Sequence, residues 1–260
     1  MRAFLIALSF LLLAACANAP QRNPLAEWVP SPNFEARRPV IIVVHATEQG
    51  SAEQSLKTLR SANRAGKVSS HYLIGDDGRI YQLVADGDRA WHAGGGSWGT
   101  ITDLNSVSIG IEMDNEVGEA YTEAQIAALL RLLDDLCTRL DIPKTQVIGH
   151  ADMAPTRKRD PGSLFPWKRL ADAGFGRWPQ GELVDPPPGF DPWMALRVIG
   201  YSIDNPRAAL HSFRLRFRGI DDGDRGTDTS ASSIDQKNAQ ALPTLQPEDL
   251  RMLYALTRQQ

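Results

Sequence analysis

The feature that most restricts the fold is an uninterrupted run of five β-branched residues, from Val40 to Val44. Branching at Cβ stiffens the side chain and favours extended backbone, so the run predicts a strand. Because no polar residue interrupts it, both faces of that strand are expected to be buried, which is typical of a sheet covered by helices on both sides. The strand delivers His45 at its C-terminal end.

The segments after this strand alternate between helical and extended patterns. The turn signal Gly75-Asp76-Asp77-Gly78 separates two short apolar runs and predicts a β-hairpin. The predicted elements are a helix over 51–62 with Ser51 as N-cap and Gln54 completing a capping box, hairpin strands over 72–74 and 80–84, a strand over 107–113, an amphipathic helix over 122–140 capped by Thr122, and a short strand over 146–149. Together they predict an α/β fold with a mixed central β-sheet flanked by helices.

The N-terminus has the pattern of an export signal, which is expected to lie outside the fold. Arg2 precedes an apolar run over 4–15, which is too short to span a bilayer and has the length of a signal-peptide core. The run ends in Leu-Ala-Ala-Cys16, which resembles the bacterial lipobox and implies a lipoprotein signal peptide over 1–15 and lipidation of Cys16. An ordinary secretory signal cut near residues 17–19 is the alternative.

Lipidation would fix the location of the protein. Acyl chains on Cys16 hold a soluble domain at a membrane without a transmembrane helix. Ala17 follows the cysteine, and similarity to lipoprotein sorting signals then implies an outer-membrane lipoprotein that faces the periplasm of a Gram-negative bacterium. The membrane is therefore expected as a partner through the lipid anchor only.

Proline-rich stretches divide the rest of the chain. Residues 16–39 are predicted to be the lipidated cysteine and a tether, and residues 181–189, with three successive prolines, a linker. These breaks leave a domain over 40–180 and a small helical domain over 190–260. Within the latter, segments that begin at prolines 192, 206 and 247 predict three helices, and residues 219–233 predict a mobile loop.

The composition argues against a nucleic-acid-binding protein and against a fold stabilised by disulfides. A formal net charge of -3 and a pI near 6 leave no basic excess for a phosphate backbone, so no nucleic-acid partner is expected. Once Cys16 is lipidated, Cys137 is the remaining cysteine, and its apolar helical segment predicts a buried, reduced thiol.

Several dispersed motifs contain histidine or acidic residues at strand ends and in one loop. His150 follows the strand over 146–149, and the Pro- and Gly-punctuated segment after it predicts a loop that displays Lys158 and Asp160. The set resembles the Amidase_2 family, which includes the peptidoglycan recognition proteins. The resemblance covers roughly residues 40–180 and consists of His45 after the first strand, Val68-Ser-Ser-His-Tyr-Leu-Ile74, Trp91-His-Ala-Gly94, Ser108-Ile-Gly-Ile-Glu112, Gly149-His-Ala-Asp152 and Lys158-x-Asp160-Pro-Gly162.

The resemblance implies a catalytic zinc site. His45, His150 and Asp160 would bind one Zn²⁺ per chain and leave a fourth position for water, which is typical of catalytic zinc. Glu112 would be the general base, and Lys158 would stabilise the oxyanion. The alternatives are a structural ion pair for Glu112 and a solvated loop lysine for Lys158.

Four further residues are candidates for substrate binding. The family pattern places His71 in a strand near the cleft and His92 in a loop on the substrate side. Trp91 and Trp98 could offer aromatic faces to the sugar. A core histidine at 71 and core tryptophans are the alternatives.

The function that these expectations describe is zinc-dependent hydrolysis of the amide between N-acetylmuramic acid and L-alanine, in peptidoglycan or its (anhydro)muropeptides. Two other functions stay open: a peptidoglycan-binding module without activity, and a zinc endopeptidase of the stem peptide. No obligate protein partner is expected. Residues 190–260 resemble small three-helix peptidoglycan-binding domains, with a helical appendage that only buttresses the enzyme as the alternative.

Overall fold

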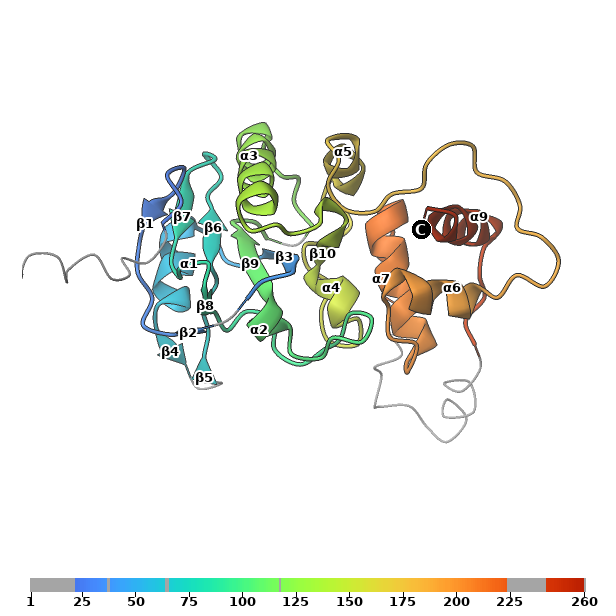
Figure 1. Cartoon of the computed structure of the whole chain (residues 1–260), viewed down its shortest axis with the longest axis horizontal. Coiled ribbons are helices and arrows are strands. Elements are labelled where there is room, and N and C mark those ends of the chain that lie inside the picture. The colour runs from blue at the N-terminus through green and yellow to red at the C-terminus, as the bar shows by residue number, and fades with distance from the viewer. Residues whose placement is uncertain (1–21, 37, 64–65, 117, 224–241, 260) are drawn as a thin grey trace, which may run out of the picture.

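The computed structural model describes residues 22–36, 38–63, 66–116, 118–223 and 242–259 (Figure 1). A sheet with the strand order β1-β7-β6-β9-β3-β10 forms the centre of the fold. Neighbouring strands are parallel except β6 and β7, which form the predicted hairpin, so the sheet is mixed as expected. Its strands are β1 (Glu27–Trp28), β3 (Ile41–Ala46), β6 (Tyr72–Ile74), β7 (Ile80–Gln82), β9 (Ser108–Met113) and β10 (Val147–Gly149).

The β-branched run forms β3, which lies between β9 and β10 and is buried along its whole length. Successive side chains of a strand point to opposite faces of the sheet. Ile42 and Val44 accordingly join the core under one helical layer, while Ile41 and Val43 join a separate cluster on the other face. The prediction that this strand is covered on both sides is confirmed.

Helix α3 (Glu123–Arg139) covers the first of these faces, together with α5 (Trp167–Asp172) (Figure 1). Its N-terminus has a complete capping box. The Gln125 backbone N–H donates to Thr122 Oγ1 at 3.1 Å, and the Thr122 N–H donates to Gln125 Oε1 at 2.9 Å. Cys137 lies on the buried side of this helix as a free thiol, as expected.

The first helix is shorter than predicted. Helix α1 spans Ala52–Leu59, with the Gln54 N–H donating to Ser51 Oγ at 3.3 Å, whereas the sequence predicted residues 51–62. The chain turns instead into a small hairpin of β4 (Ala62–Asn63) and β5 (Gly66–Lys67). Gly66 has a φ of 110°, which favours glycine and suits such a turn better than a continued helix.

The tether predicted over residues 16–39 is wrong for its described part. β1 extends the main sheet beside β7, and β2 (Glu35–Ala36) pairs with β8 (Asp88–Arg89). Asn23 is buried, and its Nδ2 donates to Asp135 Oδ2 at 2.6 Å. Strands of two residues are held by backbone hydrogen bonds to existing edges and carry too little pattern to be read from sequence. The predicted signal peptide and Cys16 lie outside the described residues.

The C-terminal region contains the predicted helices α6 (Pro192–Ile199), α7 (Pro206–Arg218) and α9 (Pro247–Thr257). Each begins with proline, and Asp191 and Asn205 cap the first two. They share an apolar core, and α7 lies beside α4 (His150–Met153) at the β10 edge of the main sheet (Figure 1). Of the predicted loop over 219–233, only residues 219–223 are described.

Among the helices of the described residues, none combines the length and apolarity that a membrane span requires. The remaining short elements are α2 (Leu104–Val107), which leads into β9, and a 3-10 turn, η1 (Lys144–Gln146), which leads into β10.

Candidate active site

The carboxyl ends of three adjacent parallel strands bring the principal candidates together. His45 near the end of β3 is in register with Glu112 of β9. Gly149, the last residue of β10, is in register with Val44, so His150 follows at the same edge of the sheet. His150 is the first residue of the one-turn helix α4, where the sequence had predicted a loop.

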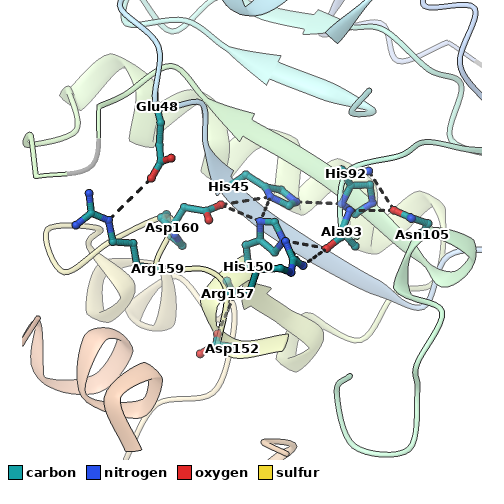
Figure 2. A network of polar contacts seen from close by, with 12 residues as sticks. His45, Glu48, His92, Ala93, Asn105, His150, Asp152, Arg157, Arg159 and Asp160 are labelled. Atoms are coloured by element: carbon teal, nitrogen blue, oxygen red, sulfur yellow. Dashed lines mark hydrogen bonds and ion pairs between the residues drawn. The ribbon is translucent and has the colours of Figure 1, made fainter. Parts of the chain in front are cut away.

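His45, His150 and Asp160 point into one buried cluster (Figure 2). His45 Nδ1 lies 2.8 Å from His150 Nδ1, and Asp160 Oδ2 lies 3.4 Å and 3.1 Å from these two nitrogens. Two imidazole nitrogens and one carboxylate oxygen that converge in this way form a donor set suited to a catalytic zinc ion. The expected trio is thus assembled in one place.

Burial and mutual charge set the protonation of these donors. Burial, and then the neighbouring His150, lower the pKa of His45 to about 4, so this imidazole is neutral near pH 7. Burial opposes ionisation of Asp160, but His150 and His45 outweigh it and hold its pKa well below the usual range. Neutral imidazole and ionised carboxylate are the forms that bind a metal.

A chain of hydrogen bonds fixes the orientation of the His45 ring. His45 Nε2 lies 3.0 Å from His92 Nδ1, His92 Nε2 lies 3.2 Å from Ser108 Oγ, and that hydroxyl donates to the carbonyl of Leu104 at 2.5 Å. Because the hydroxyl proton goes to the carbonyl, the serine oxygen accepts from His92, and His92 Nδ1 then accepts from His45 Nε2–H. This tautomer leaves His45 Nδ1 free to face the cluster.

His150 is oriented in a similar way by a backbone carbonyl. Its Nε2 lies 2.9 Å from the Ala93 carbonyl oxygen, which leaves Nδ1 for the cluster. Arg157 Nη2 donates to the same carbonyl at 2.8 Å and to the Gly95 carbonyl at 2.7 Å. Asn105 Oδ1 accepts from the backbone N–H groups of His92 and Ala93 at 3.0 Å and 2.9 Å. Imidazoles that bind metals are usually held by such outer partners.

Glu112 and Lys158 line the same pocket as the three donors. Burial, and then the charge of Asp160, raise the pKa of Glu112 to about 8, while Lys158 opposes the rise. A carboxyl group with a pKa near neutrality can both accept and return a proton. The other pocket residues include Glu48, Gln49, Thr58 and Val68.

The structure corrects two of the roles expected for histidines. His71 is fully buried in the core, where its Nδ1 accepts from the Gly110 N–H at 2.9 Å and its Nε2 lies 3.0 Å from the Asp88 carbonyl. It cannot reach a substrate, and the core alternative describes it. His92 lines the pocket, but its Nδ1 is the hydrogen-bond partner of His45 Nε2. Its geometry therefore favours a role in orienting His45 over direct contact with substrate.

The two tryptophans expected as sugar platforms also have other surroundings. The Trp98 ring packs edge to face on Tyr201 with centroids 5.1 Å apart and lies against Gly200, so it joins the catalytic and C-terminal regions. The Arg89 guanidinium lies 4.3 Å from the centroid of the half-buried Trp91 ring, and Trp91 is not among the residues that line the pocket. Both rings are half-buried, and the expectation that they offer faces to the sugar stays a prediction.

The sequence missed Asn105, Ser108 and Arg157 as supports of the site. Asn105 and Ser108 bond to His92 and Ala93, which lie 12 to 16 positions away, and Arg157 reaches residues more than 60 positions away. The motif Ser108-Ile-Gly-Ile-Glu112 contained a signal for Ser108, since a serine opens a buried strand whose next three residues are apolar or glycine.

Comparison with known proteins places this geometry among peptidoglycan enzymes. A family model, Amidase_2, described as N-acetylmuramoyl-L-alanine amidase, matches residues 35–163. N-acetylmuramoyl-L-alanine amidase AmiD of Escherichia coli K12 is 41% identical over 161 residues, which cover 56% of this chain and 56% of AmiD. The 1,6-anhydro-N-acetylmuramyl-L-alanine amidase AmpD of Citrobacter freundii is 34% identical, over 56% of this chain and 88% of AmpD.

Solved structures extend the likeness beyond the catalytic sheet. AmiD from E. coli in complex with anhydro-N-acetylmuramic acid-L-Ala-D-gamma-Glu-L-Lys matches with a TM-score of 0.68 and 29% identity, over 92% of both chains. AmpDH3 from Pseudomonas aeruginosa matches with a TM-score of 0.69 and 29% identity, over 92% of this chain and 98% of AmpDH3. The sequence match to AmiD spans little more than half the length of that relative.

Proposed function

The chain belongs to the Amidase_2 family of N-acetylmuramoyl-L-alanine amidases, and we propose that it hydrolyses the amide between N-acetylmuramic acid and L-alanine with the help of one zinc ion. The convergence of two imidazoles and one carboxylate beside Glu112 and Lys158 is the observation that carries this proposal. Zinc bound by His45, His150 and Asp160 would supply Lewis acidity that makes water nucleophilic near neutral pH.

Glu112 is the general base in this proposal. It lies in register with His45, lines the pocket and has a raised pKa. No hydrogen bond or ion pair joins its carboxylate to another side chain in the described residues, which argues against the ion-pair alternative. Its carboxylate would take a proton from the attacking water and return that proton to the leaving nitrogen of L-alanine.

Lys158 is a positively charged residue that lines the same pocket. It is partly exposed, and its charge acts on both His45 and Glu112. Its ammonium would stabilise the negative charge that develops on the lactyl carbonyl oxygen. Arg159 beside it lies 4.0 Å from Glu48 and 3.9 Å from Asp221, in exposed pairs that contribute little to stability.

The substrate class follows the relatives. AmiD was solved with an anhydro-muropeptide, and AmpD is named for its action on 1,6-anhydro-N-acetylmuramyl-L-alanine. We therefore assign this chain (anhydro)muropeptides or peptidoglycan as substrate and cell-wall turnover or recycling as its role. No nucleic acid and no obligate protein partner enter this proposal.

The location belongs to the proposal as well. A peptidoglycan substrate is consistent with a periplasmic enzyme, and an outer membrane anchor would come from lipid on Cys16, with residues 1–15 removed. Labelling cells with a fatty-acid probe tests the anchor: the wild-type chain should be labelled and Cys16→Ser should not. The glycan-binding role expected for residues 190–260 stays a prediction.

Purified anhydro-muropeptides and intact sacculi, incubated with the protein and separated by liquid chromatography with mass detection, test the function. Release of stem peptides that begin with L-Ala, abolished by a chelator and restored by zinc, supports an amidase. Shortened stems that stay on the sugar would support the endopeptidase alternative. Intact muropeptides, with zinc bound and the muropeptide retained, would support the binding-module alternative.

A further inference from the structure

A buried carboxylate that the proposed reaction does not use lies two residues from a metal-binding candidate. Asp152 is 1% exposed, on the same one-turn helix as His150. Figure 2 shows its side chain directed away from the cluster of His45, His150 and Asp160. A buried carboxylate is costly unless hydrogen bonds or a counterion stabilise it.

Its partners come from both sides of the contact between the sheet and the C-terminal helices. Asp152 Oδ2 accepts from the Gly149 N–H at 2.7 Å and from Arg216 Nη1 at 2.5 Å. Its Oδ1 accepts from the Tyr201 hydroxyl at 2.6 Å. Arg216 lies on α7, and Tyr201 lies in the connection between α6 and α7.

Arg216 also reaches the strand that leads to His150. Its Nη2 donates to the Val147 carbonyl of β10 at 3.1 Å, and its guanidinium stacks on the Trp167 ring at 4.1 Å. Arg216 is 5% exposed, so water does not compete with these contacts. One guanidinium therefore ties Val147, the first residue of β10, to Asp152 of α4, and His150 lies between these two residues in the chain.

The surrounding packing keeps the C-terminal helices against this point. The Gly99 N–H donates to the Gly200 carbonyl at 2.7 Å, and the Trp98 ring fills the space that a Cβ on Gly200 would need. Tyr201, whose hydroxyl binds Asp152, packs edge to face on that same ring. The contact is thus a close-packed, hydrogen-bonded interface that meets the helix carrying His150.

We propose that the C-terminal helices are a structural part of the metal centre, in which Arg216 and Tyr201 clamp Asp152 and so hold His150 in position for the metal. This inference rests on the proposed zinc function. Arg216, Tyr201 and Asp152 are positioning residues that act through α4 and do not touch substrate. The helices would then contribute to metal affinity whether or not they also bind glycan.

Zinc affinity of the full chain, measured by competition with a chromogenic chelator, tests the clamp. The variants are Tyr201→Phe, which removes only a hydroxyl, and Arg216→Lys, which keeps the charge but cannot bond to Asp152 and Val147 in the same fork. Arg218→Lys is the matched control, because Arg218 lies on the same helix and donates to the buried Asp249 at 2.8 Å. Thermal unfolding of each metal-free variant is measured alongside.

Loss of partners around metal-binding imidazoles weakens metal binding by about 10- to 100-fold. We expect about a 10-fold weaker zinc affinity for Tyr201→Phe and Arg216→Lys, and an altered visible absorption of bound Co²⁺, whose d–d bands report ligand geometry. Arg218→Lys should change neither the zinc affinity nor the Co²⁺ spectrum, even if it lowers the unfolding temperature as much as the other two variants do.

The clamp is overturned if Tyr201→Phe and Arg216→Lys bind zinc as tightly as wild type with an unchanged Co²⁺ spectrum, or if Arg218→Lys weakens binding as much as they do. If the wild-type chain itself binds no zinc, both the proposed function and the proposed positioning role of Arg216, Tyr201 and Asp152 are refuted. The wild-type titration therefore separates the two failures.

Discussion

Replacement of His92 by leucine should weaken metal binding without removing a metal donor. His92 Nδ1 accepts the Nε2–H of His45 at 3.0 Å, and His92 Nε2 in turn lies 3.2 Å from Ser108 Oγ. Leucine has a similar volume but no acceptor, so the His45 N–H would be left buried without a partner. The Ser108 hydroxyl would keep its bond to the Leu104 carbonyl at 2.5 Å.

The expected size of the effect follows from that single lost acceptor. A buried donor without an acceptor costs about 1–3 kcal/mol. A free-energy difference of about 1.4 kcal/mol corresponds to a tenfold change in an equilibrium constant. His45 also loses the bond that sets its tautomer, and the ring becomes free to rotate away from His150. We therefore expect zinc to bind His92→Leu about 10- to 100-fold more weakly than wild type.

His92→Asn is the matched control, since its side-chain oxygen can take the place of Nδ1 as acceptor. Chelator competition gives the zinc affinity of both variants, and muropeptide turnover at saturating zinc gives their activity. We expect the asparagine variant to bind zinc within a few-fold of wild type and the leucine variant to recover part of its activity at high zinc. Equal affinities for wild type and His92→Leu would refute this reasoning.

Four further outcomes are expected. Glu112→Gln should lower kcat by about 100- to 10,000-fold and leave zinc affinity nearly unchanged, as turnover and chelator competition would show, because it removes only the proton acceptor; a loss of zinc binding would count against the general-base role. The pKa of Glu112 rises on folding from 4.5 to about 8, so the folded protein holds this proton more tightly, and urea unfolding of the metal-free protein should show stability that falls as pH rises through this window. Glu112→Gln should flatten that slope, and an unchanged slope would contradict the burial argument. Asp160→Asn should weaken zinc binding by more than about 100-fold, beyond the loss for an outer partner, and should abolish the rise in unfolding temperature that zinc gives wild type; zinc stabilisation that persists in this variant would exclude Asp160 as a ligand. Leu132→Ala, fully buried under the sheet, should destabilise the protein by about 2–5 kcal/mol in urea unfolding and leave the zinc affinity of the folded protein intact.

The elements that the sequence predicted well are those with a strong local pattern. The β-branched run gave β3, and the helical periodicity after Thr122 gave α3 with its capping box. The grouping of His45, Glu112 and His150 follows once their strands are parallel neighbours, because such strands end at one edge. Asp160 could be added to this group only because of its resemblance to the family motif. The spacing of the sequence alone does not predict that Asp160 lies beside His150 in space.

The elements that could not be predicted depend on contacts between distant residues. The sequence before Val40 predicts a tether because the two-residue strands β1 and β2 carry no pattern of their own and form only beside partners far along the chain. The packing of the Trp98 ring against Gly200 and Tyr201 likewise depends on residues about 100 positions away, which the sequence around Trp98 does not indicate. The contact of Arg216 with Asp152 joins residues 64 positions apart, and although Asp152 ends a family motif, nothing in that motif points to Arg216.

The site also shows why the sequence alone does not distinguish metal-binding histidines from structural ones. His45, His71 and His92 are all buried and all bonded through their rings, and they differ in what lies at the second nitrogen. His71 has both nitrogens at backbone groups, whereas His45 presents Nδ1 to His150 and Asp160. A metal-binding role therefore depends on one free, inward nitrogen, which only the three-dimensional structure reveals.

Hydrolysis in water enriched with oxygen-18 tests the central claim most directly. An anhydro-muropeptide incubated with the zinc-loaded protein should yield one labelled oxygen in the lactyl carboxylate of the sugar and an unlabelled stem peptide with a free L-alanine amine. Label in a carboxylate within the stem, or no label with the muropeptide intact, would contradict amide hydrolysis at the muramic acid by this chain.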